Sequence, residues 1–355
     1  MRRAFLNWRG RCLTASLCCA AFLSPSAIAD NQPAPAETVV RVTPAIKGLI
    51  RGGLKYLASK QNIDGSWSLK EGRMGHPVAI TGYALLAFMA AGNLPHEGDY
   101  AKNVASGMQF LLESAQPDGL FRGTSGSQYM YNHGIATIAL AELYGESNAP
   151  TLRPKLERAI NVILKAQNPA GGWRYTPAPR DADISVTVLQ VVALRAAQDA
   201  GLSIPQDAID KAIAYVVSCY HEDNGGFSYQ PAGAPGFART AAAIYSLQVL
   251  GKYDDPRVKA GSDYLVKNLT SGKDRSHWSY GNYYAAPAQY MIGGNTWQDW
   301  YTQISQNITK TAQREGDMVY WDKAADPSTP GAVFTTAAFV HVLAMPYHLM
   351  PLYQR

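Results

Sequence analysis

Cysteine is scarce in this sequence and is gathered at one end. The chain has 355 residues and four cysteines; Cys12, Cys18 and Cys19 lie in the N-terminal stretch, and Cys219 stands alone in the rest of the chain. A disulfide framework needs several paired cysteines, and a zinc site needs cysteine or histidine ligands at suitable spacing. The sequence therefore predicts no internal disulfide and no metal site. We expect Cys219 to be a buried, unreactive thiol.

Charged residues and long apolar runs are also few. Only 17% of the residues are charged, whereas 47% are hydrophobic, which is enough to build a full core. Beyond the N-terminus no apolar run approaches the ~20 residues of a membrane-spanning helix. This excludes a spanning segment but leaves peripheral membrane contact open. Without the first 29 residues the chain has 28 basic and 27 acidic side chains, so we expect no nucleic-acid partner.

The N-terminus has the composition of an export signal. Residues 1–11 carry four arginines and no acid, the apolar stretch "CLTASLCCAAFL" follows, and "SPSAIA" ends in a small-x-small cleavage pattern at Ala29. The pair Arg2-Arg3 resembles a twin-arginine signal, with ordinary secretion as the alternative. We expect a periplasmic or secreted protein. Three segments are predicted: a signal peptide (residues 1–29), a flexible leader (30–44) and a single domain (45–355).

A glycine-aromatic turn recurs about every fifty residues. The copies "QNIDGSW", "AQPDGLF", "QNPAGGW" and "HEDNGGF" each place a glycine two residues before the aromatic residue. Two weaker copies, "DRSHWSYG" and "GDMVYWD", continue the series. A fixed period of this length is typical of repeat architectures. The six turn aromatics are Trp67, Phe121, Trp173, Phe227, Trp278 and Trp321.

The segments on either side of each turn predict two kinds of helix. The preceding segment, as in residues 46–57, has apolar residues three and four apart, which indicates a helix with one buried face. The following segment, as in "VTVLQVVAL", is apolar on nearly every side and must be enclosed. Six such pairs predict an all-α fold, a closed α/α toroid of six inner helices within six outer helices. A threonine recurs near the start of five inner helices: Thr81, Thr137, Thr187, Thr240 and Thr336.

The turns resemble those of a known superfamily. Gln61–Trp67 and Gln167–Trp173 both read QxxxGxW, which is the QW repeat of the squalene cyclase and protein prenyltransferase superfamily. The resemblance extends over residues 45–351 and implies the α/α toroid, with the repeats fastening outer helices to the turns. More narrowly, with the segments "MYNHGIATIALAELYG" (130–145) and "MPLYQR" (350–355), the chain is similar to secreted, single-toroid repeat proteins of environmental bacteria. The toroid hosts unrelated chemistries, so the repeats alone predict no reaction.

The same resemblance points to a pair of aspartates. Squalene cyclases carry their initiating acid in a D-x-D-D-T segment shortly after a GGW turn. Here Trp173 is followed by Asp181-Ala182-Asp183-Ile184. The resemblance implies that Asp183 takes the place of the proton donor and Asp181 that of the first aspartate, while Ile184 replaces the third. The structural alternative is that Asp183 caps the following helix.

Alignment of the repeats by their threonines adds a histidine. It places His133 and Asp183 at one level, four positions before Thr137 and Thr187, on neighbouring inner helices. A histidine beside a carboxyl group can tune its acidity or form an acid/base pair. This predicts His133 as a third catalytic candidate at the mouth of the ring. The alternative is a hydrogen-bonded histidine of the scaffold.

Residues in the connections to the inner helices are the candidates for substrate binding. Aromatic rings can stabilise carbocations or stack on sugars, and Arg239 can bind an anionic group. Packing at the rim or in the core is the alternative for each ring, as it is for Tyr229 and Tyr280 nearby. The substrate-binding candidates are Tyr131, Tyr175, Arg239, Tyr283, Tyr284 and His76.

Three functions remain open from the sequence. The leading hypothesis is a terpenoid-cyclase-like protein that binds or transforms an isoprenoid or other apolar molecule, with no cofactor. The zinc pair Asp-x-Cys of protein prenyltransferases is absent, because Val217 stands two residues before Cys219. The alternatives are a carbohydrate-active enzyme that acts on a polysaccharide and a non-catalytic scaffold for an envelope partner. A deep apolar lumen favours the first, an open polar cleft the second and a plugged lumen the third.

Overall fold

Residues Val39–Arg355 form one compact unit in the computed structural model. The signal peptide predicted for residues 1–29 and most of the leader lie outside the described residues. The structure describes residues 40–69, 75–123, 128–147, 150–269 and 276–353.

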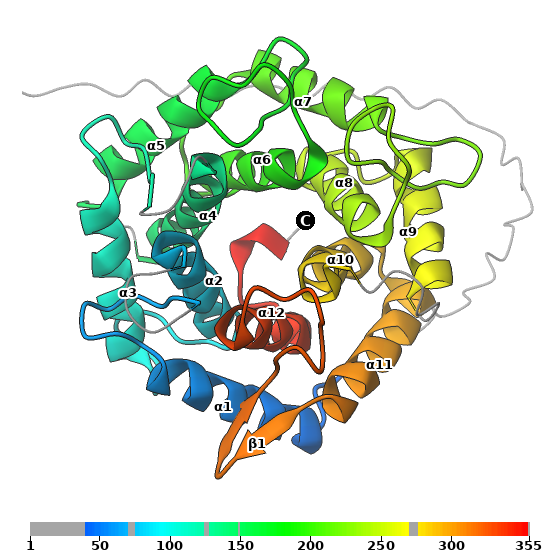
Figure 1. Ribbon diagram of the computed structural model, residues 1–355. Coiled ribbons are helices and arrows are strands. Elements are labelled where there is room, and N and C mark those ends of the chain that lie inside the picture. Colours follow the sequence, from blue (N-terminus) through cyan, green and yellow to red (C-terminus); the bar gives the residue numbers. More distant parts are fainter. Residues whose placement is uncertain (1–39, 70–74, 124–127, 148–149, 270–275, 354–355) are drawn as a thin grey trace, which may run out of the picture. The chain divides into compact units, whose positions relative to one another are not determined.

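Helices alternate between an inner and an outer ring along the chain (Figure 1). The inner ring consists of α2 (Pro77–Ala90), α4 (Tyr129–Ser147), α6 (Ile184–Asp199), α8 (Phe237–Val249), α10 (Trp278–Ile292) and α12 (Ala332–Ala344). The outer ring consists of α1 (Pro44–Ser59), α3 (Ala101–Ser114), α5 (Arg153–Ala166), α7 (Gln206–Ser218), α9 (Pro256–Asn268) and α11 (Gly294–Lys310). The predicted all-α, α/α-toroid fold is confirmed.

The inner ring is closed, and its helices are enclosed as the sequence predicted. Each inner helix packs against the next, and α12 returns to pack against α2. Every residue of α2 is buried, whereas α5 buries one face, lined by Leu156, Ile160 and Ile163. Small residues permit the close packing; a Cβ atom at Gly134 would lie 2.7 Å from the Gln190 side chain on α6. Such packing lets one ring of helices fit inside another.

The QW turn is a hydrogen-bonded staple between three segments. Gln61 Nε2 donates to the carbonyl oxygen of Gly65, across the turn, and to that of Asn103 on α3, at 2.9 Å each. The indole Nε1 of Trp67 donates to the Leu57 carbonyl oxygen at 2.6 Å. Gly65 has a φ of +84°, and a Cβ atom there would lie 2.3 Å from the Ser106 carbonyl oxygen. The glycine is therefore required by both backbone angle and space.

The recurring threonines accept hydrogen bonds from the turns. In one repeat a histidine takes the place of the threonine, which shows that the repeat alignment was wrong there. In four repeats the turn aromatic donates its backbone N–H to a threonine Oγ1: Trp67 to Thr81, Trp173 to Thr187, Phe227 to Thr240 and Trp321 to Thr336. In the second repeat Phe121 donates instead to Nδ1 of His133, while Thr137 donates to the His133 carbonyl oxygen. The alignment by Thr137 was thus wrong by one helical turn.

The assignment of Trp278 as a turn aromatic was also wrong. Trp278 is the first residue of the inner helix α10 and stacks on Phe237, the first residue of α8, at a centroid distance of 5.4 Å. Trp278 lacks both the preceding glycine and the recurring threonine, whereas Trp321 lacks only the glycine and still donates to Thr336. The loss of both marks was the signal that separated the two.

The chain ends by folding across one end of the ring. A hairpin of β1 (Gln313–Glu315) and β2 (Met318–Tyr320) precedes the last turn. After α12 come two short 3-10 helices, η1 (Met345–Tyr347) and η2 (Pro351–Tyr353). The second contacts α4, α6 and α10, and Figure 1 shows this red segment in the middle of the ring.

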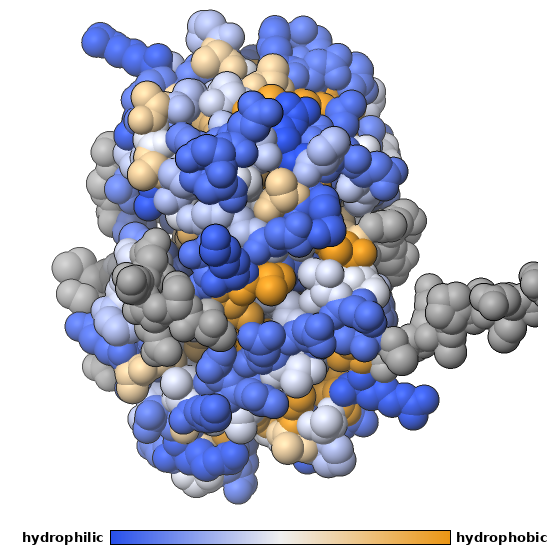
Figure 2. Space-filling view, turned by 90° about the vertical axis from the view of Figure 1, so that its right-hand side faces the viewer, coloured by the Kyte–Doolittle hydropathy of each residue, from blue (hydrophilic) through white to orange (hydrophobic). Residues whose placement is uncertain are grey.

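The surface of the ring is mostly polar. Figure 2 shows a mainly hydrophilic face on which hydrophobic residues form small groups, as is ordinary for a folded domain. Within the described ranges, every helix is too short or too polar to traverse a lipid bilayer.

Candidate functional site

Asp183 lies at the end of the ring where the inner helices begin. It is the N-cap of α6, and its Oδ1 accepts hydrogen bonds from the Val186 backbone N–H at 2.9 Å and the Ser185 hydroxyl at 2.7 Å. The predicted capping role is confirmed. The residue is nonetheless fully buried, which is unusual for a charged cap, because most carboxylates stay in water unless they are paired.

The second oxygen of Asp183 faces an arginine that the sequence analysis did not single out. Oδ2 has no hydrogen-bond partner among the described residues and lies 3.4 Å from Arg174 Nε. Arg174 also forms an ion pair with Asp181, which is largely exposed and accepts a further bond from Gln230. Burial raises the pKa of Asp183, while its hydrogen bonds and Arg174 oppose that shift. On balance the pKa of Asp183 is raised above that of an exposed carboxyl, because the effect of burial outweighs these opposing contacts.

A tyrosine and a serine extend the hydrogen bonds of Asp183. The Tyr131 hydroxyl lies 2.6 Å from Ser185 Oγ. Since Ser185 uses its one hydroxyl proton toward Asp183, Tyr131 is the donor in this pair. The result is a chain of hydroxyl groups that leads from α4 to the carboxyl on α6.

Further tyrosines complete a cluster around the carboxyl. The hydroxyl groups of Tyr175 and Tyr229 lie 2.6 Å apart, and Tyr131 stacks on Tyr175 at a centroid distance of 6.0 Å. Tyr280 of α10 donates to the Ser185 carbonyl oxygen at 3.0 Å. The guanidinium group of Arg174 lies 5.0 Å from the Tyr175 ring centroid. We call Tyr131, Tyr175, Tyr229 and Tyr280 the mouth tyrosines.

The structure does not bring His133 to Asp183. Its Nδ1 accepts the Phe121 N–H at 3.2 Å, so its Nε2 carries the proton and donates to the Ala159 carbonyl oxygen on α5 at 3.0 Å. Burial lowers the pKa of His133 to about 4. The histidine points toward the outer ring and joins two scaffold segments. The predicted pairing with Asp183 came from the alignment error at Thr137.

The remaining candidates are dispersed. Tyr283 and Tyr284 are buried on α10. Arg239, in the first turn of α8, donates to the Ala234 carbonyl oxygen in the loop before that helix. His76 is the N-cap residue of α2 and has a φ of 57°.

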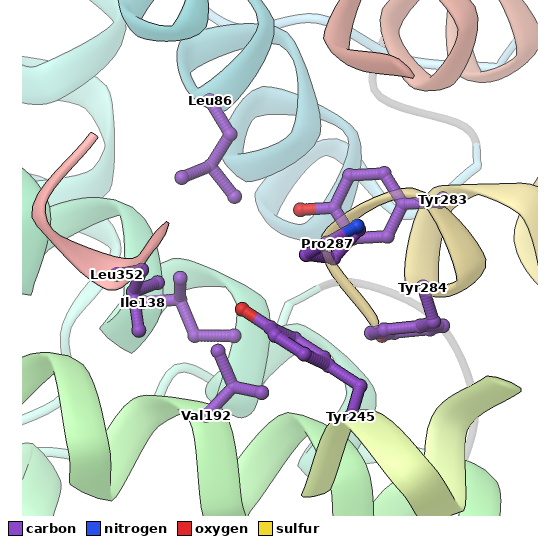
Figure 3. A pocket seen from close by; sticks show the side chains of 8 residues that line it. All are labelled: Leu86, Ile138, Val192, Tyr245, Tyr283, Tyr284, Pro287 and Leu352. Atoms are coloured by element: carbon purple, nitrogen blue, oxygen red, sulfur yellow. The ribbon is translucent and has the colours of Figure 1, made fainter. Parts of the chain in front are cut away.

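Tyr283 and Tyr284 line a small cavity in the centre of the ring (Figure 3). Its volume is about 10 Å³, which is room for about one water molecule. The hydroxyl groups of Tyr245 and Tyr283 point toward its middle. The full lining is Leu86, Ile138, Val192, Tyr245, Tyr283, Tyr284, Pro287 and Leu352.

A ladder of aromatic rings connects the mouth tyrosines to this cavity. Tyr280 packs edge-on against Tyr284 at a centroid distance of 4.9 Å, and Tyr284 against Tyr283 at 5.1 Å. Tyr83 of α2 packs edge-on against Tyr283 at 5.1 Å. The interior of the ring is therefore filled with tyrosine side chains between Asp183 and the cavity.

A second buried carboxyl, Glu142 of α4, lies at the far end of the ring. It accepts the Leu352 backbone N–H, and its Oε2 has no hydrogen-bond partner among the described residues. Burial raises the pKa of Glu142 to about 8. Sequence reasoning missed Glu142 because one acid within an apolar helix carries no motif. It missed Arg174 although this residue directly follows the QW tryptophan.

The described residues offer no group of three or more metal-binding side chains. Cys219 is buried, and burial raises the pKa of its thiol to about 11. A protonated, enclosed thiol is a poor metal ligand.

Comparison with known proteins identifies the relatives of this fold. The model of the squalene-hopene cyclase C-terminal domain matches residues 77–179. Drimenyl diphosphate synthase of Streptomyces showdoensis is 27% identical over 179 residues, which make up 50% of this chain and 31% of that protein. The resemblance to the squalene cyclase and protein prenyltransferase superfamily is confirmed. A second drimenyl diphosphate synthase, from Streptantibioticus cattleyicolor, is 30% identical over 111 residues, 30% of this chain and 20% of that protein. The chain thus spans less than a third of the length of these curated relatives.

Solved structures share the toroid at low identity. The type II terpene cyclase MstE from Scytonema, in complex with geranylgeranyl dihydroxybenzoate, has a TM-score of 0.56 at 13% identity, with 86% of this chain and 99% of that chain covered. The GH76A alpha-1,6-mannanase of Salegentibacter sp. HEL1_6 has a TM-score of 0.64 at 7% identity, with 86% and 98% covered. These likenesses show the fold alone, since terpene cyclases and mannanases do unrelated chemistry on it.

Proposed function

We propose that this chain is an exported, terpenoid-cyclase-like protein that binds an isoprenoid or other apolar molecule within its toroid and protonates it with Asp183. The observation that carries the proposal is a buried carboxyl group with one unbonded oxygen, set among tyrosine rings at the start of an inner helix. The sequence relationship to drimenyl diphosphate synthases supports the same class of substrate.

The geometry suits proton donation to an alkene. Oδ1 is occupied by the Ser185 and Val186 donors, so the proton is carried on Oδ2. In the first step the O–H bond of Asp183 breaks, a C–H bond forms at one alkene carbon, and positive charge appears on the other. Electron-rich tyrosine faces stabilise such a cation. A second double bond of the same molecule attacks the cation and closes a ring, and the cyclised cation then loses a proton to water. The product is an isomer of the substrate, so the reaction needs no other co-reactant.

The hydroxyl chain supplies the returning proton. After transfer, Ser185 passes its proton to Oδ1 of the Asp183 carboxylate, takes one from Tyr131, and Tyr131 takes one from water. A half-turn of the carboxyl group about its Cβ–Cγ bond then brings the protonated oxygen to the Oδ2 position. Arg174 stabilises that carboxylate at 3.4 Å. The protein side of the cycle is thereby complete with residues of α4, α6 and the turn after Trp173.

The test is a product assay with a matched pair of variants. The mature protein is incubated separately with farnesyl diphosphate, geranylgeranyl diphosphate and squalene, and products are separated and identified by mass spectrometry. Asp183→Asn keeps the shape of the side chain and its capping oxygen but cannot donate the proton. Asp181→Asn changes the exposed partner of the same arginine. We expect cyclic isomers from the wild type and from Asp181→Asn, and none from Asp183→Asn; equal product from all three proteins would overturn the assignment of Asp183.

The small lumen favours one alternative. A cavity of about 10 Å³ is far below the ~300 Å³ or more of a usual ligand pocket, so the second candidate is a non-catalytic scaffold with a filled interior. Equilibrium binding of the same isoprenoids separates the two, because a scaffold binds none of them. Alpha-mannan and polyuronate, included in the binding series, test the carbohydrate alternative.

A further inference from the structure

The walls of the central cavity come from inner helices, whereas its floor comes from the C-terminal segment. Five of the inner helices contribute walls, and in each the lining residue nearest the floor lies eight or nine positions after the first helical residue, as Val192 does on α6. At 1.5 Å per residue this is about 12–14 Å below the level at which the helices begin. Leu352 is the lining residue that comes from outside the inner helices.

A turn after α12 and an alternation of exposed and buried side chains bring Leu352 to the cavity. After α12 the chain turns at His348, which has a φ of 56°, and then alternates its side chains between water and the ring. Leu349 is 47% exposed, whereas Met350 and Leu352 are 2% and 3% exposed. The segment after His348 therefore buries two apolar side chains, Met350 and Leu352.

A buried carboxyl fastens this segment from inside. Glu142 accepts the backbone N–H of Leu352, and the 3-10 helix that contains Leu352 contacts α4, α6 and α10. The walls belong to helices that are held on both sides by neighbours. The floor is one short 3-10 helix whose Leu352 N–H is bound by Glu142, so it is the part of the lining that can change at least cost to the ring.

We propose that Leu352 is the floor of the ligand lumen and sets the length of the apolar molecule that the toroid accepts. The inference rests on the proposed function, since it assumes that an isoprenoid enters from the Asp183 end. A ligand whose reacting end lies at Asp183 has to displace tyrosine rings of the aromatic ladder for its tail to reach the cavity. The tail then meets Leu352 after the depth of about two to three helical turns.

The test is a chain-length series. Binding of geraniol, farnesol and geranylgeraniol to the mature protein is measured by titration calorimetry for the wild type, Leu352→Ala and Leu352→Phe. Each buried methylene group contributes about fourfold in affinity. We expect Leu352→Ala to improve binding of the longest alcohol relative to the shortest by at least about fivefold, and Leu352→Phe to shift the preference the other way. Leu349→Ala, on the exposed side of the same segment, is the matched control and should leave the ratio unchanged.

The outcomes separate the two proposals. If the wild type binds these alcohols and all four proteins show the same length preference, Leu352 is not the floor and the proposed function stands. If none of the proteins binds any alcohol, the isoprenoid function fails and the floor fails with it. Should Leu352→Ala not fold, Leu352→Val removes one methylene group, and a smaller shift in the same direction is expected.

Discussion

The hydroxyl groups of Tyr131 and Ser185 lie 2.6 Å apart and place a tyrosine of α4 in the hydrogen-bond chain of Asp183. Tyr131→Phe keeps the ring but removes the donor at the head of this chain. We expect turnover to fall by on the order of tenfold to a hundredfold, because the carboxyl is reprotonated more slowly, while the Kd for the isoprenoid is nearly unchanged. Steady-state kinetics and calorimetry measure the two effects. Tyr129→Phe, on the same helix with its ring 4.5 Å from Arg122, is the control; equal loss in both variants contradicts the relay.

The glycine of the second complete QW turn gives a stability prediction. Gly171 has a φ of +94°, and a Cβ atom there would lie 2.1 Å from the Lys211 carbonyl oxygen on α7. Gly201 has a similar φ of +84° but nothing within 4 Å. Gly201→Ala therefore reports the backbone strain alone, about 1 kcal/mol, and Gly171→Ala adds the displacement of α7, for a total of about 3 kcal/mol or more. Urea unfolding compares the two. Equal losses would mean that the turn and α7 separate without cost.

The ring was predictable because its determinants are local and repeated. The QxxxGxW turns identify backbone positions that only glycine occupies, and the apolar pattern distinguishes enclosed from half-buried helices. The prediction failed in two repeats: Trp278 lacked both the glycine and the recurring threonine and began a helix, and His133 took the acceptor role of a threonine. A sequence pattern identifies the residue type it expects, but it cannot reveal that a different side chain makes the same hydrogen bond.

The site was predictable only in part, for a related reason. Asp183 was found by its distance from the GGW turn, and the mouth tyrosines by their place in the connections. Ser185 and Glu142 matter through contacts with distant parts of the chain. The Leu352 N–H, for example, donates to Glu142, which joins residues 210 positions apart. No local pattern records a contact of that separation.

The buried histidine makes acid stability a test of its scaffold role. The pKa of His133 is lowered from 6.5 to about 4, so below pH 6.5 the unfolded chain binds a proton that the folded chain refuses. The contribution of the neutral His133 to the free energy of unfolding is fully present above pH 6.5. It is lost at up to about 1.4 kcal/mol per pH unit as the pH falls toward 4. His133→Thr, which restores the acceptor of the other repeats, should lose less over this window in urea unfolding. A parallel pH dependence for both proteins would show that His133 can be protonated without unfolding.

Glu142 should act on stability with the opposite sign. Its pKa is raised from 4.5 to about 8, so between these values the folded state holds a proton that the unfolded chain has released. Its contribution is fully present below pH 4.5 and is lost as the pH rises toward 8. Glu142→Gln keeps an oxygen that accepts the Leu352 N–H and cannot ionise, so the variant should gain stability relative to the wild type from pH 6.5 to 8. Above pH 6.5 the histidine slope has ended, and the difference between the two unfolding curves isolates the carboxyl. If the difference in stability between the two proteins stays constant from pH 6.5 to 8, Glu142 is already charged in the folded ring, and a carboxylate holds the segment that carries Leu352. If the difference grows, a neutral carboxyl group holds this segment and releases it as the proton leaves.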